Sequence, residues 1–600
     1  MYKRIIQKMN VVNRLLNTRK IKSHSFPIIL FGLIFIFLWI LVFFTSKTPN
    51  DPGKFSLGTV ENVQSSEPDE IVIDDEVVID DEIVIDDEVV AVDTENKLTD
   101  NIFQDIISKI SSMGPKVSLP FSQTFSETDT TVDLKDDSLG YYIKKCPNIG
   151  NNPEDWVDTL SYNTLKDSYL IVNDNVKEEI SSAHKGFIEH LKGNWEYPST
   201  FYEGSGIVIG GGGKYSLQAY AVISAIRELK TTLPIEVLIP SSLEQDKPFC
   251  EMLNTKFDDV KCIFLQDIFE DQFLKTHKFH AFQYKSLALM VSSFQNVLLL
   301  DADDFPVRNI NDIFDNDIFE ENGMIVWPDF WRRTTHPYFY ESAGIDIDFN
   351  KRLRNFYENI DEINETTDEG KDSKLPYHDF EGALPDPSSE TGEFLIDKKR
   401  HWKSLILSLY YNVHGPNVFY HLFSQYAAGQ GDKETFLAAA HILELPYYQV
   451  YLKPSLDAYF EPKEDARRSV AYYQKDYRKD YQYRFIDNEK NLNDFLNHKH
   501  TESDSLFAHC NLPKFDVIQM TDKNDFTYVK DDEHFRAMTC KDCLKEVDLE
   551  KIFTVAYYEE VCKEDQSENV FKYLVHKNHD KICKYWKKRY DLVLNTVIAD

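Results

Sequence analysis

The chain has 600 residues, of which 42% are hydrophobic and 14% aromatic, and its formal net charge is -34. This length suits one large domain or several ordinary ones, and the apolar fraction is ample for a packed core. So acidic a chain is not expected to bind nucleic acid, which requires a basic surface. Any anionic substrate would have to meet a local cation.

The N-terminal region has the opposite charge to the rest of the chain. Residues 1–50 contain eight Lys or Arg and no Asp or Glu, whereas residues 51–100 contain 17 acids and two Lys. Residues 26–45 read FPIILFGLIFIFLWILVFFT, which is long enough for an uncharged helix to cross a bilayer. The positive-inside rule therefore predicts a cytosolic tail (1–25), a transmembrane signal anchor (26–45) and a single-pass type II membrane protein whose remainder is lumenal. A cleaved signal peptide is the alternative, but its apolar region would be shorter and would end in a small-residue cleavage site.

An acidic stem is expected at residues 46–135, which show no convincing helical period. Residues 70–90 repeat a six-residue unit, EIVIDDEVVIDDEIVIDDEVV. Its carboxylates suggest calcium binding, but the glycine and ligand spacing of a folded calcium loop are missing, so a charge-extended spacer is favoured. Residues 136–600 are expected to form the lumenal domain, with a glycosylation acceptor at Asn364.

The cysteines suit a lumenal, disulfide-forming protein, because their number is even. Four of the eight lie in the last 61 residues, where local pairing is expected: Cys540, Cys543, Cys562 and Cys583. The CKDC motif at 540–543 lacks the further ligands of a zinc site and the setting of a redox motif. Structural pairing is therefore favoured.

Strands and helices alternate from about residue 205. Short apolar runs predict strands at 206–209, 235–239, 261–265 and 296–300, and helical periodicity predicts helices at 215–230 and 281–294. This pattern predicts an α/β domain with a mainly parallel sheet covered by helices. In such domains ligands bind beyond the carboxyl ends of the strands, so residues that follow strands are candidates for a site.

A glycine-rich turn follows the first of these strands. Residues 210–213 are all glycine, and Lys214 begins the next helix. We expect Gly211, Gly212 and Lys214 to contact a nucleotide, because backbone N–H groups at such a turn can cradle a phosphate. The turn matches neither the Walker pattern nor the dinucleotide-binding pattern, which weakens ATPase and oxidoreductase assignments. A tight strand-to-helix turn without a ligand is the alternative.

Three carboxylates follow the fourth strand, in the sequence NVLLLDADDFPV. Asp301 and Asp303 are two residues apart, so in an extended chain both would point the same way. Two carboxylates at a strand end make half of an oxygen-rich site for a divalent ion, which would offset their repulsion and bridge a diphosphate leaving group. A D-x-D motif after an apolar strand is typical of sugar-nucleotide-dependent glycosyltransferases with the α/β fold called GT-A. Solvated acids in a turn are the alternative.

The segments around this motif resemble a known family. In chain order they are GIVIGGGGKYSLQAYAVISAIRELKTTLPIEVLIP, FHAFQYKSLALMVSSFQNVLLLDADDFPVRN, VWPDFWRRTTHPYFY, LPDPSSETGEFLIDKKRHWKSL, GDKETFLAA and LFAHCNLPK, and they span about 206–514. They resemble the fungal Golgi α-mannosyltransferases that add branches to mannan outer chains, most of all the α-1,2-mannosyltransferases. One departure is Asp304, where similar proteins are expected to have Asn, and its role is left open.

The resemblance implies a fold, a reaction and a location. The fold would be a GT-A-type catalytic domain behind the signal anchor and stem. The reaction would transfer mannose from GDP-mannose to an α-mannoside acceptor in α-mannan or an N-glycan outer chain, with Mn²⁺ as cofactor. Donor and product would both be α, so the configuration would be retained, and the leaving phosphate could take the acceptor's proton in place of a general base. The protein would lie in the Golgi membrane, and a complex with other Golgi mannosyltransferases is left open.

The resemblance also implies catalytic and binding residues. Asp303 would bind the metal directly, and Asp301 would hold the metal or the ribose. Lys285 would reach a donor phosphate or sugar, although a solvated helix lysine is an equal alternative. Glu390 and Asp432 would contact mannose hydroxyls, the first from a loop lining the donor sugar and the second from a position facing the reaction centre. A surface loop is the alternative for each.

Further expectations concern the neighbourhood of these residues. Gly392 is expected at a turn where the backbone approaches another group closely. His509 follows the apolar run LFA at another predicted strand end and would complete the metal site, since Mn²⁺ prefers about six donors and accepts imidazole. Lys514 resembles a lysine that touches the diphosphate, and Cys510 is expected to be paired. The aromatic segment 327–340 could stack on sugar or guanine, or belong to the core.

Two other classes of function stay open. One is a different transferase of the same fold, such as an α-1,3-mannosyltransferase or an enzyme that uses a UDP-sugar, which the spacing does not exclude. The other is a non-catalytic mannan-binding subunit. The retained pair Asp301 and Asp303 counts against that subunit, because neighbouring acids repel each other without a metal.

Overall fold

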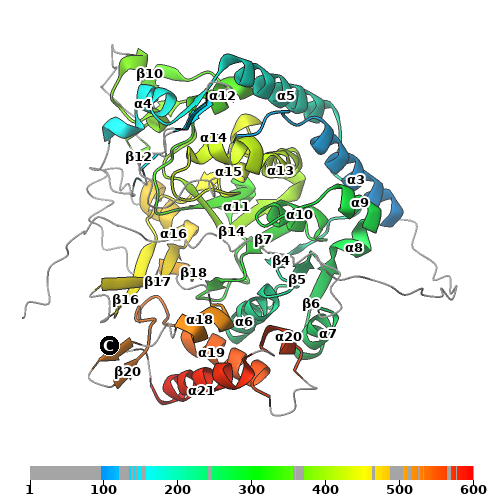
Figure 1. Cartoon of the computed structure of the whole chain (residues 1–600), viewed down its shortest axis with the longest axis vertical. Coiled ribbons are helices and arrows are strands. Elements are labelled where there is room, and N and C mark those ends of the chain that lie inside the picture. The colour runs from blue at the N-terminus through cyan, green and yellow to red at the C-terminus, as the bar shows by residue number, and fades with distance from the viewer. Residues whose placement is uncertain are drawn as a thin grey trace, which may run out of the picture. The chain divides into compact units, whose positions relative to one another are not determined.

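The structure is a computed structural model, and it describes much of the chain from residue 96 onward (Figure 1). The described residues are 96–119, 134–136, 141–143, 146–147, 149, 157–240, 246–355, 358–359, 370–461, 466–486, 504–510, 515–523, 528–530, 533–563, 569–575, 578–596 and 598. They belong to one compact unit, Ile85–Asp600. The predicted tail, signal anchor and repeat lie outside the described residues, as do Asn364 and Lys514. No helix within the described residues is long and apolar enough to span a membrane.

A seven-stranded sheet forms the centre of this unit, in the order β15-β9-β14-β7-β4-β5-β6. Its strands are β4 (Ser205–Gly210), β5 (Ile235–Ile239), β6 (Val260–Phe264), β7 (Asn296–Leu300), β9 (Met324–Pro328), β14 (Ser389–Asp397) and β15 (Tyr448–Gln449). Neighbouring strands are parallel, except that β14 is antiparallel to both β7 and β9. The predicted α/β domain with a mainly parallel sheet is therefore confirmed, and the four predicted strands are β4 to β7.

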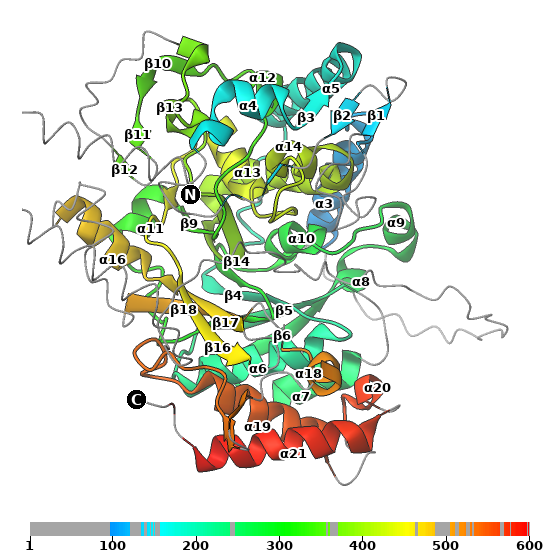
Figure 2. The ribbon, with the colours of Figure 1, turned by 60° about the vertical axis from the view of Figure 1, so that its left-hand side comes forward.

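Helices cover both faces of the sheet because its strands are apolar on both sides. Ile207 and its neighbour Val208 belong to different core clusters, as the two-residue period of a strand requires. The cluster of Ile207 includes helices α6 (Tyr215–Glu228), α19 (Leu549–Val561) and α21 (His579–Asn595). The cluster of Val208 includes α10 (Gln283–Val291), α13 (Lys398–Val413) and α15 (Thr435–Ile442). The two groups of helices lie on opposite sides of the sheet in both views (Figures 1 and 2).

A second sheet, of four antiparallel strands, is attached to the end of β7. Its order is β16 (Ser455–Glu461), β17 (Ala466–Lys475), β18 (Ser505–His509) and β8 (Asp304–Pro306). Because β8 begins shortly after Leu300, this sheet starts at the carboxyl end of β7. His509 lies opposite Asp304 on one side and Tyr472 on the other. Asp304 and His509, which are far apart in the sequence, thus meet beside the D-x-D motif.

Further helices and strands complete the described part of the chain. The remaining helices are α3 (Asn96–Ser112), α4 (Tyr162–Asp167), α5 (Asp174–Gly193), α7 (Asp246–Lys256), α8 (Leu265–Ile268), α9 (Asp271–Thr276), α11 (Asp317–Asn322), α12 (Pro337–Ala343), α14 (Tyr420–Ser424), α16 (Tyr477–Tyr481), α18 (Val517–Lys523) and α20 (Lys572–Val575). The remaining strands are β1 (Leu134–Asp136), β2 (Tyr141–Ile143), β3 (Leu170–Val172), β10 (Asp348–Arg352), β11 (Arg354–Asn355), β12 (Glu358–Asn359), β13 (Phe380–Glu381), β19 (Tyr528–Lys530) and β20 (Glu533–Phe535).

Two sequence predictions need correction here. The stem predicted at 46–135 contains α3, whose Phe103, Ile106 and Ile110 are buried and which packs against α13. These spacings of three and four residues place the apolar side chains on one face of a helix, so the folded domain begins before residue 136. The helix predicted at 281–294 is also shorter, since α10 covers only Gln283–Val291.

The cysteine prediction is confirmed for three pairs. The disulfides are Cys250–Cys262, Cys540–Cys543 and Cys562–Cys583, and the last two are local, as expected. Cys146 and Cys510 are free and buried, so the expected pairing of Cys510 is wrong. The reason is that these two thiols belong to different core clusters, on opposite faces of the central sheet.

Candidate active site

The candidate site lies where β7 and β14 meet. Because β14 is antiparallel to β7, with Glu393 opposite Leu300, the first residues of β14 lie beside the residues that follow β7. The Asp301 N–H donates to the Gly392 carbonyl at 2.7 Å. The register of β14 against β9 also shifts after Glu390, and such bulges redirect side chains. The predicted D-x-D and S-E-T-G-E segments are therefore neighbours.

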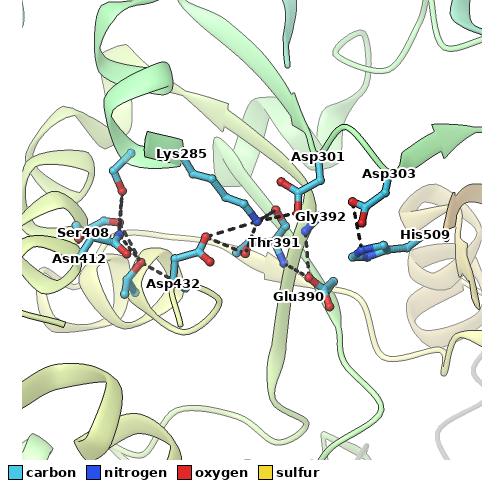
Figure 3. A network of polar contacts seen from close by, with 12 residues as sticks. Lys285, Asp301, Asp303, Glu390, Thr391, Gly392, Ser408, Asn412, Asp432 and His509 are labelled. Carbon is cyan, nitrogen blue, oxygen red and sulfur yellow. Dashed lines mark hydrogen bonds and ion pairs between the residues drawn. The ribbon is translucent and has the colours of Figure 1, made fainter. Parts of the chain in front are cut away.

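Asp301, Asp303 and His509 form a group that fits a divalent ion. One potential ligand atom of each lies within 4.8 Å of those of the other two. Asp303 and His509 face each other in Figure 3, with His509 Nε2 3.6 Å from Asp303 Oδ1, which is longer than a hydrogen bond. Two carboxylates and an imidazole are donors that suit Mn²⁺ and related ions.

The conformation of the motif differs from the prediction. The Asp304 N–H donates to the Asp301 carbonyl at 3.1 Å, so the chain turns after β7. The extended conformation expected for residues 301–303 is therefore wrong. Both acids still face one site, because the turn, and not the alternation of a strand, brings their carboxylates together.

Asp304, whose role the sequence left open, forms a buried pair with Glu393. Both side chains are fully buried, and their oxygens find no hydrogen-bond donor in the described part of the chain. Burial raises the pKa of Asp304, and burial together with the nearby Asp304 charge raises the pKa of Glu393 well above its usual value. Two adjoining buried carboxylates would repel each other, and a proton shared between Asp304 and Glu393 would relieve that repulsion.

Lys285, on α10, links the motif to the other predicted acids. Its Nζ donates to Asp301 Oδ2 at 2.8 Å and to the Thr391 carbonyl at 3.1 Å, and it lies 3.6 Å from Asp432 Oδ2 (Figure 3). Burial would lower the pKa of Lys285, but Asp301 and Asp432 raise it above its usual value, so the lysine is charged. The solvated-lysine alternative is wrong, because this side chain is only 17% exposed and its Nζ is paired with Asp301 and Asp432.

Asp432 is held at the site from two sides. The Thr391 hydroxyl donates to Asp432 Oδ2 at 2.9 Å. Behind it, Thr435 donates to the Asp432 carbonyl at 2.7 Å and accepts from Asn412 Nδ2 at 2.9 Å. Asn412 also bonds Ser408, so α13 and α15 together support the loop that carries Asp432 (Figure 3). Burial raises the pKa of Asp432, and Lys285 opposes that rise.

Glu390 is fully engaged with protein groups. Its Oε1 accepts the N–H groups of Thr391 and Gly392, at 2.8 and 3.0 Å. Its Oε2 accepts the hydroxyl of Tyr472 at 2.7 Å, and the same hydroxyl lies 2.6 Å from His509 Nδ1. Burial would raise the pKa of Glu390, but His509, Lys285 and the Tyr472 hydrogen bond lower it to about 2. Glu390 is therefore a carboxylate.

Gly392 confirms the expected close approach. A Cβ atom on this residue would lie 2.6 Å from His509 Nδ1 and 2.8 Å from Cε1 of the same ring. Such distances are far shorter than a carbon–nitrogen contact. Only glycine therefore lets β14 pass beside the imidazole.

The glycine-rich turn after β4 is held by other parts of the protein. The N–H groups of Gly211, Gly212 and Gly213 donate to the Leu238 carbonyl, the Ser216 hydroxyl and Asp246 Oδ1, at 2.9, 3.1 and 3.0 Å. These bonds, one of them to the carboxylate of Asp246, are typical of a tight strand-to-helix turn without a ligand, which was the alternative to phosphate binding. Contact of Gly211, Gly212 and Lys214 with a nucleotide stays a prediction.

The aromatic segment 327–340 belongs mainly to the core. Trp327, Phe339 and Tyr340 are buried, and Arg332 and Arg333 are ion-paired with Asp386 and Glu434. Glu434 also accepts the hydroxyls of Ser388 and Ser389, so this buried network joins the loop after β9 to the start of β14 and to the loop of Asp432.

Two residues of the site have no counterpart in the sequence predictions. Thr391 contacts both Lys285 and Asp432, and its position inside the S-E-T-G-E segment was the available signal. Tyr472 contacts Glu390 and His509 but stands in none of the resembling blocks. Only the pairing of β17 with β18 places it there.

Comparisons with known proteins identify the family. The mannosyltransferase family model Mannosyl_trans3 matches residues 204–485. The α-1,2-mannosyltransferase MNN2 of Saccharomyces cerevisiae is 37% identical over 457 residues, which cover 71% of this chain and 75% of that protein. The α-1,2-mannosyltransferase MNN24 of Candida albicans is 40% identical over 332 residues, which cover 54% of this chain and 46% of that protein. The structure of the galactosyltransferase LgtC with donor and acceptor sugar analogues overlaps 41% of this chain and 73% of its own chain. The sequence identity is 11% and the TM-score is 0.24, so no conclusion is drawn from this overlap. The chain belongs to the family of fungal α-1,2-mannosyltransferases and is an enzyme of that class.

Proposed function

We propose that the chain transfers mannose from GDP-mannose to α-mannoside acceptors of mannoprotein glycans, forming α-1,2-linked branches with retained configuration and with Mn²⁺. The observation that carries the proposal is the group of Asp301, Asp303 and His509 beyond the carboxyl end of β7. In α/β sheets this edge is where ligands bind. The mainly parallel sheet, with this group at its edge, supports a GT-A-type catalytic domain.

Each residue has a defined part in this proposal. Asp301, Asp303 and His509 hold the ion, which when bound offsets the charge of the diphosphate and stabilises it as a leaving group. Lys285 fixes the spacing of Asp301 and Asp432 and keeps a positive charge near the anionic donor. Asp432 contacts mannose hydroxyls, held in place by Thr391. These contacts supply orientation and electrostatic stabilisation, which are the main contributions a transferase of this type needs.

The surroundings of Glu390 support transfer on one face of the sugar. Both of its oxygens accept hydrogen bonds from protein groups, so it is poorly placed to attack the anomeric carbon. In a retaining reaction the leaving phosphate can take the acceptor's proton, and no general base is then required. A contact between Glu390 and a mannose hydroxyl remains part of the proposal.

The proposed location follows from the sequence of the N-terminal region. The apolar span at 26–45, with basic residues before it and acids after it, supports a single-pass type II protein of the Golgi membrane with its catalytic domain in the lumen. The acidic segment that follows would be a stem, and Lys514 and Asn364 keep their predicted roles in diphosphate binding and glycosylation.

A donor screen tests the reaction. The full-length chain, in detergent, is incubated with an α-1,6-linked mannose acceptor and one of GDP-mannose, UDP-glucose or UDP-galactose, with Mn²⁺ or with EDTA. We expect transfer only from GDP-mannose, and only when Mn²⁺ is present. Preference for a UDP-sugar would refute the donor assignment, and full activity in EDTA would refute the metal assignment.

A further inference from the structure

We propose that Tyr472 is a positioning residue for the metal site: it links Glu390 to His509 and fixes the imidazole with Nε2 toward Asp303. The inference rests on the proposed function, because it assumes that His509 is a metal ligand. It adds a residue that lies outside every motif of the sequence, and it gives Glu390 a role that does not require contact with the sugar.

The direction of the hydrogen bonds follows from the chemistry of the three groups. A carboxylate only accepts, so the single hydroxyl proton of Tyr472 is donated to Glu390 Oε2 at 2.7 Å. The hydroxyl oxygen, 2.6 Å from His509 Nδ1, must then accept, and Nδ1 must carry the proton. In neutral imidazole the lone pair is consequently on Nε2, the atom that faces Asp303 Oδ1 at 3.6 Å. A metal-binding histidine needs that tautomer, and a partner on its other nitrogen is what fixes it.

The position of Tyr472 is set by the fold. Tyr472 lies directly opposite His509 in the β17–β18 pair, and the two ring centroids are 4.8 Å apart. The tyrosine is 4% exposed, and Phe330 packs edge-on against its ring at 5.2 Å. The backbone at Gly392 also lies close to the imidazole, since a Cβ atom there would be 2.6 Å from Nδ1. The strand pairing and the contact with Phe330 therefore position the hydroxyl for its hydrogen bond with Nδ1.

Glu390 is anchored just as firmly. Its second oxygen accepts two N–H groups of its own turn, so the carboxylate has one orientation. The chain from Glu390 through Tyr472 to His509 therefore has no freely rotating member. Outer partners of this kind typically change metal affinity 10- to 100-fold when they are removed.

The experiment measures metal binding without turnover. Mn²⁺ alone is titrated into the full-length chain in detergent, with free Mn²⁺ read from its EPR signal and nitrogen coordination read from pulsed EPR. The variants are Tyr472→Phe, His509→Gln and Tyr473→Phe. Tyr473 is the matched control, because it is a buried neighbour on the same strand whose hydroxyl bonds Asp457 at 2.9 Å and not the site. Thermal melting without metal checks that each variant folds.

We expect Tyr472→Phe to weaken Mn²⁺ binding about 10- to 100-fold and to weaken the nitrogen coupling, while its metal-free melting temperature stays near that of Tyr473→Phe. Tyr473→Phe should bind Mn²⁺ as the wild type does. If His509→Gln weakens binding and removes the nitrogen coupling but Tyr472→Phe changes neither, the positioning role is wrong and the metal site stands. If His509→Gln has no effect either, the metal site of the proposed function fails, and this inference with it.

Discussion

Replacing Gly392 with alanine tests how closely β14 must approach His509. The new Cβ would lie 2.6 Å from Nδ1, and ordinary contact begins at 3.4 Å, so the ring must move by about 0.8 Å (3.4 minus 2.6). That movement would also disturb the hydrogen bond between Tyr472 and Nδ1. A displacement of about 1 Å in a catalytic constellation can lower activity about 100-fold, and disturbed outer partners weaken metal binding about 10- to 100-fold. We therefore expect Gly392→Ala to raise the Mn²⁺ concentration for half-maximal transfer at least tenfold.

The assay is a Mn²⁺ titration of mannose transfer at fixed GDP-mannose. Gly206→Ala is the matched control, because its Cβ would lie 2.4 Å from the ring of Phe294 at the start of β4, away from the D-x-D motif. Both variants overfill a packed region, which costs about 1–3 kcal/mol of stability. Only Gly392→Ala should shift the Mn²⁺ midpoint. An unchanged midpoint and rate in Gly392→Ala would refute the placement of His509 beside the metal.

Three further predictions concern the ligand, the buried network and the topology. Asp303→Asn should remove nearly all transfer while leaving the melting temperature intact, and retention of more than a tenth of wild-type activity at saturating Mn²⁺ would contradict a direct ligand role. Glu434→Ala should lower the free energy of unfolding by about 3–5 kcal/mol, because it removes the carboxylate that is ion-paired with the buried guanidinium of Arg333. An unchanged melting temperature would show that this ion pair does not stabilise the fold. Protease added to sealed Golgi vesicles should spare everything beyond residue 45, and digestion of the large domain would overturn the type II assignment.

The central strands were predictable because each is a short apolar run with a clear boundary. The runs at 206–209 and 296–300 are apolar on both faces, which is the pattern of a buried parallel strand, and both appear in the structure as β4 and β7. A functional site at the end of β7 was predictable as well, since a buried strand rarely ends in three carboxylates without a function.

The contacts between distant segments were not predictable from local pattern. Tyr472 faces His509 only because β17 pairs with β18 in one particular register, and a shift of one residue would present Tyr473 instead. The antiparallel insertion of β14 between β7 and β9, which places Gly392 beside Asp301, likewise depends on tertiary packing. The resemblance supplied Glu390 and His509 as candidates, but it did not supply the hydrogen bonds that join them.

One local pattern was misjudged, and a second stays a prediction. The apolar positions of α3 follow a helical period, but the acidic composition around them favoured an unstructured stem. The glycine-rich turn suggested phosphate binding, yet its N–H groups are used by Leu238, Ser216 and Asp246. In both cases the sequence shows the apolar side chains or N–H groups of the segment itself. It does not show which other segments of the fold pack against them or accept their hydrogen bonds.

The central claim is that Asp301, Asp303 and His509 support mannose transfer from GDP-mannose. The most direct measurement is NMR analysis of the product formed by the full-length chain with GDP-mannose, Mn²⁺ and an α-1,6-linked mannose acceptor. The account predicts a new mannose joined in α configuration to the 2-position of the acceptor, formed by the wild type and not by Asp303→Asn. A β-linked product, a different linkage, or equal product from the Asp303→Asn variant would contradict it.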